Sequence, residues 1–147
     1  MSETFIIDEW LWSDLNGDNG EQKQKEAFSF LETLYKKCDK IAVAKSSKFQ
    51  QKEWNFSKSA TDLIKRKIVK FYWQSIRWNF LKYEEIDIER EGIVGIENID
   101  PDDIYLIKIH YKTKASIITT DNKLINALRS KNIPCKQRDQ FLQDYKL

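Results

Sequence analysis

The sequence predicts a three-layer α/β/α fold with a central, mostly parallel sheet. Short apolar runs of strand length alternate along the 147 residues with segments whose apolar residues recur at helical spacing. This alternation is typical of parallel sheets, because a crossover helix usually connects two parallel neighbours. We see no internal repeat, low-complexity tract or linker. The length suits one domain, which we expect to span residues 1–147.

The expected elements follow in order along the chain. Apolar runs predict strands at residues 4–8, 41–44, 116–119 and near 133–136, with a weaker candidate at 85–88. Helical spacing predicts helices at residues 21–37, 57–83 (one helix or two), 122–130 and 138–145, and a further helix that opens at 101 and includes 104–109. Ser46 and Ser47 are candidate caps for a further helix that includes Phe49. Pro101 followed by two acidic residues is typical of a first helical turn.

Composition excludes several classes of site. The net charge of +2 neither demonstrates nor excludes nucleic-acid binding. Cys38 and Cys135 lack the spacing of a zinc site, and no phosphate-binding loop or nucleophile elbow is present. A single histidine, His110, excludes catalysis that needs two. With no secretory leader and no apolar run of membrane-spanning length, we expect a cytoplasmic protein that does not contact membranes.

Acidic residues follow two of the predicted strands and open one predicted helix. Asp8 comes directly after the first strand, Asp121 follows the strand that ends at Thr119, and Asp103 begins an apolar helix. Because the carboxyl ends of parallel strands meet at one edge of a sheet, we expect these carboxylates to lie close together. Mg²⁺ and Mn²⁺ prefer such oxygen ligands. Helix capping is the alternative for Asp103 and Asp121.

The chain resembles the PIN-domain family of nucleases at both ends. The resemblance rests on TFIID at the first strand, on DDIYLIKIHYKTKA and TTDNKL, and on IPCK and RDQFL near the C-terminus. It implies a PIN-like fold and an RNA-cleaving site that binds Mg²⁺ or Mn²⁺ through three or four acids. By position, the resemblance implies that the acids are Asp8, Glu53, Asp103 and Asp121, accompanied by the hydroxyl of Thr119.

Three acidic positions leave alternatives open. Glu53 is the best match for the second acid, although it lies far from the strand that precedes it. Asp102 is a rival for Asp103, whose spacing to the following apolar residues fits better. Glu9 would point away from Asp8 if the first strand continued, so we treat it as auxiliary.

A basic and aromatic stretch offers a second candidate surface. Residues 65–78 interleave Lys and Arg with rings, including Trp73 and Trp78. Such a pattern is able to contact phosphates and stack nucleobases. The interpretation we favour is a solvated helix face whose rings point into the core.

The leading hypothesis is a metal-dependent endoribonuclease that cleaves an RNA phosphodiester and leaves a 5′-phosphate. PIN proteins of this size are commonly toxins silenced by a cognate antitoxin, and many are homodimers, so the resemblance implies an antitoxin partner and a homodimer. The alternative is a catalytically inactive PIN-like module that binds RNA or protein. A weaker third hypothesis is a metal hydrolase with a small-molecule substrate.

Overall fold

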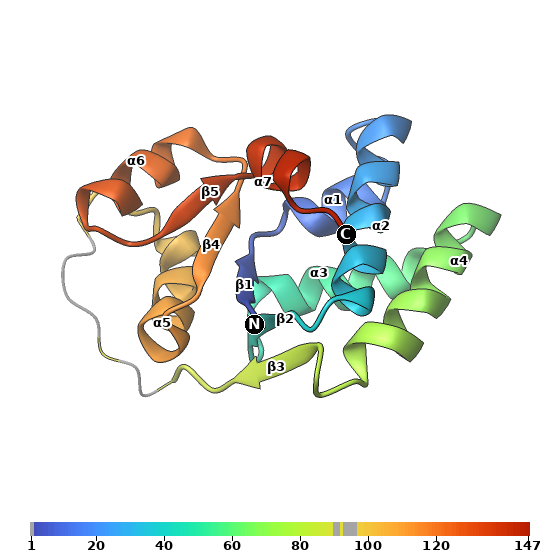
Figure 1. The fold of residues 1–147 in the computed structure, drawn as a ribbon, viewed down its shortest axis with the longest axis horizontal. Helices are drawn as coiled ribbons and strands as arrows, with labels where there is room; N and C mark the ends of the chain where they lie inside the picture. The colour runs from blue at the N-terminus through green and yellow to red at the C-terminus, as the bar shows by residue number, and fades with distance from the viewer. Residues whose placement is uncertain (1, 90–91, 93–96) are drawn as a thin grey trace.

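The five strands form one parallel sheet in the order β3-β2-β1-β4-β5 (Figure 1). The computed structural model describes residues 2–89, 92 and 97–147. Within these residues the strands are β1 (Thr4–Ile7), β2 (Lys40–Ala44), β3 (Tyr83–Ile86), β4 (Ser116–Thr119) and β5 (Cys135–Gln137). The sequence therefore predicted the fold class correctly.

The register of the two central strands brings their carboxyl ends together. Ile7 of β1 lies opposite Ile118 of β4, and the backbone N–H of Asp8 donates to the carbonyl of Ile118 at 3.0 Å. Asp8 therefore leaves the sheet beside Thr119, the last residue of β4.

Helices cover both faces of the sheet. They are α1 (Trp10–Leu15), α2 (Glu21–Lys36), α3 (Lys48–Ser59), α4 (Leu63–Phe71), the π-helix η1 (Tyr72–Arg77), the 3₁₀ turn η2 (Pro101–Asp103), α5 (Ile104–Thr113), α6 (Asn122–Ser130) and α7 (Arg138–Asp144). Figure 1 shows α5 and α6 on one side of the sheet and α1 to α4 on the other.

Each face of the sheet has its own hydrophobic core, because side chains alternate along a strand. In β1, Phe5 and Ile7 pack with residues of α1, α2, α3 and α7, whereas Ile6 packs with residues of α5 and α6. Ile6 is fully buried. Among the described residues, no helix has both the length and the apolar composition that crossing a bilayer requires.

Two local expectations differ from the structure, and one further short helix is present. The helical segment expected over 57–83, as one helix or two, begins later and ends earlier: α3 continues to Ser59, Asp62 caps α4 by accepting a hydrogen bond from the Lys65 backbone N–H at 2.8 Å, and η1 ends at Arg77. The strand expected at 85–88 lies two residues earlier, at Tyr83–Ile86. A short helix, α1, begins at Trp10, three residues after β1 ends.

Candidate metal centre

Asp8 is held rigidly at the carboxyl edge of the sheet. Its Oδ2 accepts a hydrogen bond of 2.7 Å from Thr119 Oγ1, and its Oδ1 accepts one of 2.7 Å from the backbone N–H of Glu9. Burial raises the pKa of Asp8, although these two hydrogen bonds oppose the shift by favouring the ionised form. The arrangement fixes a carboxylate in an environment that disfavours its charge.

Glu9 faces the same space as Asp8. The strand ends at Ile7 and Glu9 adopts helical backbone angles (φ −65°, ψ −11°). Glu9 was expected to point away from Asp8 only if the strand continued. The strand does not continue, so that expectation does not apply. Lys52 Nζ lies 3.1 Å from Glu9 Oε1, and the Tyr105 hydroxyl donates to Oε2 at 3.4 Å. The sequence signal for this placement was the helical spacing of Trp10, Leu11 and Leu15 directly after the acid.

Asp103 projects from the start of α5 toward Asp8 and Glu9. It ends the turn η2 and precedes α5, yet its carboxylate accepts no capping hydrogen bond from the helix. Burial, followed by the charges of Asp8 and Asp121, raises its pKa to about 6. Its rival Asp102 is exposed and pairs with Lys48 Nζ at 2.6 Å. Capping therefore does not explain Asp103.

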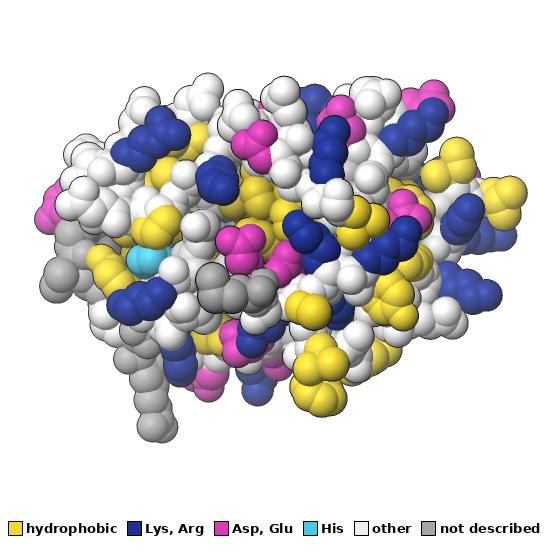
Figure 2. All heavy atoms as spheres, in the orientation of Figure 1, with side chains coloured by type: hydrophobic (Ala, Val, Ile, Leu, Met, Phe, Trp, Pro, Cys, Tyr) yellow, Lys and Arg dark blue, Asp and Glu magenta, His cyan; other side chains and the backbone are white. Residues whose placement is uncertain are grey.

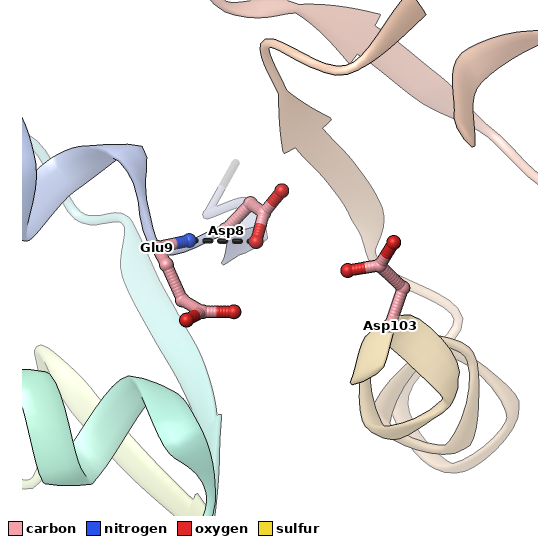
Figure 3. A group of neighbouring side chains, drawn as sticks. All are labelled: Asp8, Glu9 and Asp103. Atoms are coloured by element: carbon pink, nitrogen blue, oxygen red, sulfur yellow. Dashed lines mark hydrogen bonds between the residues drawn. The ribbon is translucent and has the colours of Figure 1, made fainter. Parts of the chain in front are cut away.

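The carboxylates of Asp8, Glu9 and Asp103 point into one space between the end of β1 and the start of α5 (Figure 3). One oxygen from each lies within 4.8 Å of the others. We call this group the acidic cluster. It lines a cavity of about 390 Å³ together with Trp10, Ser13, Asp14, Asn19, Lys23, Lys52 and Thr120.

Asp121 lies beside the acidic cluster and also caps a helix. Its Oδ1 accepts hydrogen bonds from the backbone N–H groups of Lys123 (3.0 Å) and Leu124 (3.2 Å) at the start of α6. Its own N–H donates to Thr119 Oγ1 at 3.1 Å. The charge of Asp121 contributes to the raised pKa of both Asp8 and Asp103. Asp121 therefore caps α6 and also lies close enough to the acidic cluster to affect its charges.

Glu53 is not part of the acidic cluster. It is 3% exposed. Its carboxylate accepts hydrogen bonds from the hydroxyls of Tyr72 (2.7 Å) and Tyr83 (2.9 Å) and from Arg77 Nε (2.8 Å). Burial raises the pKa of Glu53, whereas its three donors lower it. The structure thus places Glu53 in a buried network of its own, and its neighbour Lys52 reaches the cluster instead.

The donor set of the acidic cluster fits a hard divalent cation. Hard cations bind carboxylate oxygens, and carboxylates this close repel one another unless a cation or a proton lies between them. The raised pKa values of Asp8 and Asp103 reflect that repulsion together with burial. His110 contributes no ligand, because it is buried and its Nδ1 lies 2.8 Å from the Ala115 carbonyl.

Comparison with known proteins identifies the fold. No family model and no curated protein matches the sequence. The structure is similar to a chain in the crystal structure of VapBC2 from Rickettsia felis bound to a DNA fragment from their promoter. The TM-score is 0.54 at 14% identity, and the match covers 91% of this chain and 98% of that chain. A likeness at this identity establishes a shared α/β/α fold alone.

Proposed function

We propose that this chain is a PIN-like, metal-dependent endoribonuclease whose centre is the acidic cluster. The observation that carries the proposal is the convergence of Asp8, Glu9 and Asp103 at the carboxyl edge of the sheet. The similarity to a chain of the VapBC2 structure supports it at the level of the fold. Both agree with the resemblance at TFIID and DDIYLIKIHYKTKA.

Asp8, Glu9 and Asp103 would hold Mg²⁺ or Mn²⁺, with Asp121 as a further ligand. A divalent cation in such a centre supplies activation of water and stabilisation of charge on a phosphodiester. Thr119 orients Asp8 through its 2.7 Å hydrogen bond. Tyr105 and Lys52 contact Glu9 and so fix its carboxylate. We propose that Glu53 is a positioning residue for α3 and η1, since its oxygens are engaged with Tyr72, Arg77 and Tyr83.

The biological role we propose is the toxin of a toxin–antitoxin pair acting in the cytoplasm, with RNA as substrate. The PIN resemblance and the fold shared with VapBC2 support this role. A homodimer and an antitoxin partner form part of the same proposal.

A single pair of variants tests the nuclease. Asp103→Asn should abolish Mn²⁺-dependent cleavage of a labelled single-stranded RNA. Asp102→Asn makes the same chemical change at an exposed neighbour outside the acidic cluster and should leave cleavage unchanged. EDTA should stop the wild-type reaction. If Asp103→Asn cleaves the RNA as fast as Asp102→Asn and the wild type do, the acidic cluster has no part in the mechanism.

A catalytically inactive RNA- or protein-binding module is the second candidate. The observation in its favour is Lys52, whose ammonium group already lies 3.1 Å from Glu9 and neutralises part of the cluster. Titration with Mn²⁺ by calorimetry separates the two functions. The folded wild-type protein should bind Mn²⁺ if it is a nuclease, and the absence of heat at millimolar Mn²⁺ would favour the module.

A further inference from the structure

Aromatic rings are exposed where the chain passes from η1 to β3. Trp78 is 73% exposed and Phe80 is 83% exposed, and Leu81 beside them is also exposed. The sequence interpretation that we favoured placed the rings of this stretch in the core. Trp73 partly fulfils that expectation, since it is half-buried and its Nε1 donates to Ser57 Oγ at 2.7 Å. Trp78 contradicts it, and Phe80 lies two residues beyond that stretch.

The exposed ring of Trp78 packs against two neighbouring side chains, Trp73 and Arg77. Its centroid lies 5.5 Å from that of Trp73, and the Arg77 guanidinium lies 5.1 Å from the Trp78 ring. Arg77 is itself fixed by its 2.8 Å ion pair with the buried Glu53. A ring held in this way loses little freedom when a planar group stacks on it, so binding costs less entropy.

The helix that leads to these rings is strongly basic. Residues 63–83 contain no acid and six bases, namely Lys65, Arg66, Lys67, Lys70, Arg77 and Lys82. Three of them, Arg66, Lys67 and Lys70, are exposed and form no ion pair with any described residue. In a chain whose net charge is only +2, this is a marked local excess of positive charge. Figure 2 shows basic and hydrophobic side chains side by side over the α4 end of the molecule.

Helix α3 connects this surface to the acidic cluster. Lys52 on α3 contacts Glu9, and Ser57 one and a half turns later accepts the hydrogen bond from Trp73. The five residue steps from Lys52 to Ser57 rise about 8 Å along α3, which is about two nucleotides of a stacked single strand. Lys52, Asn55 and Lys58 are exposed along α3.

We propose that Arg66, Lys67, Lys70, Trp78 and Phe80 form a docking surface for single-stranded RNA, separate from the acidic cluster. The bases contact phosphates and the two rings stack nucleobases. A second copy of this chain fits less well, because a symmetric contact would bring the same unpaired positive charges together. The role of this surface in RNA cleavage rests on the proposed ribonuclease function. RNA binding to the surface itself does not require a metal ion.

Binding is measured by fluorescence anisotropy of a labelled 12-nucleotide single-stranded RNA in EDTA, so that no cleavage occurs. Trp78→Ala and Phe80→Ala should each weaken binding by about tenfold. Leu147→Ala is the control, because Leu147 is a 77% exposed apolar residue that lies outside the proposed surface. It should change the affinity less than about twofold, which is the scatter expected for an uninvolved surface residue. Thermal melts should show that all three variants fold.

The charges are tested by the salt dependence of the same measurement. Arg66→Ser/Lys70→Ser should reduce the slope of log K against log[salt] by about 1.4, which is two phosphate contacts to a single strand. The control Arg129→Ser/Lys136→Ser removes the same two charges from exposed positions near β5 and should change the slope little. Unchanged RNA binding in both the ring and the charge variants would overturn the proposal and favour an acidic protein as the occupant.

Different results would refute the docking surface and the proposed ribonuclease function. RNA binding that depends on Trp78, in a protein that never cleaves RNA with Mn²⁺, would support the docking surface and refute the nuclease. Cleavage that requires Asp103, with binding indifferent to Trp78 and Phe80, would do the reverse. Self-association that disappears in Phe80→Ala, with RNA affinity unchanged, would assign the surface to a second copy.

Discussion

Replacing Asp103 with Asn should stabilise the metal-free protein while removing its metal affinity. Asp103 is half-buried next to Asp8, with Asp121 nearby, and its pKa is raised from 3.8 to about 6. Its ionised form is therefore less favourable in the folded protein than in the unfolded chain. Asparagine carries no charge, so the repulsion and the cost of burying a charge both disappear.

The magnitude follows from the size of the shift. At about 1.4 kcal/mol for each pKa unit, a shift from 3.8 to about 6 corresponds to an upper limit of ~3 kcal/mol at pH 7.5. Because the side chain is partly solvated, screening reduces this to ~1 kcal/mol. For a domain of this size, ~1 kcal/mol raises the melting temperature by about 3 °C.

The pH dependence has a defined sign. A raised carboxyl pKa means that the folded state holds the proton more tightly, so the penalty is present in full above about pH 6 and is lost as the pH falls toward 3.8. The stability difference between Asp103→Asn and wild type should therefore shrink from pH 7.5 to pH 4. Melting curves in EDTA at these two pH values measure it.

Asp102→Asn is the control for this prediction, because Asp102 is exposed and paired with Lys48. It should leave the melting temperature unchanged or slightly lower it. If the wild-type protein is more stable than Asp103→Asn in EDTA at pH 7.5, the carboxylates of the acidic cluster do not destabilise the metal-free protein by repelling one another, and this prediction is wrong.

Further variants address the remaining acids and their partners. Asp121→Asn should keep the fold, because Asn is also a good N-cap, and should weaken Mn²⁺ binding and stop RNA cleavage; unchanged cleavage would exclude Asp121 from the site. Glu53→Gln should lower the free energy of unfolding by about 2–3 kcal/mol, measured in urea, because Arg77 loses its charged partner; a selective loss of Mn²⁺ affinity would instead make Glu53 a ligand. Thr119→Val removes a hydrogen bond that lowers the pKa of Asp8, so calorimetry should show Mn²⁺ affinity falling more at pH 6 than at pH 8.

The fold was predictable because its signals are local. The three inner strands, β1, β2 and β4, are short apolar runs, and Asp8 and Asp121 mark strand ends that parallel pairing brings to one edge. The boundary between α3 and α4 was expected at Ser57, a few residues too early, since helical spacing continues to Ser59 and only the cap at Asp62 marks the start of α4.

The acidic residues were harder to rank than to find. The position of Glu9 depends on β1 ending at Ile7, and a single residue of strand length reverses which way a side chain points. Glu53 has tertiary partners, Tyr72, Arg77 and Tyr83, that lie 19 to 30 residues away, and no local pattern reveals them. Position in the chain, without these contacts, could not distinguish a ligand from a buried ion pair.

The most direct test of the cluster is an anomalous difference map from crystals soaked in MnCl₂ and measured at the manganese absorption edge. We predict a peak between the carboxylates of Asp8 and Asp103, with Glu9 or Asp121 completing the protein ligands. A map without a peak there, from crystals whose protein is folded as described, would contradict the assignment of a metal centre to these residues.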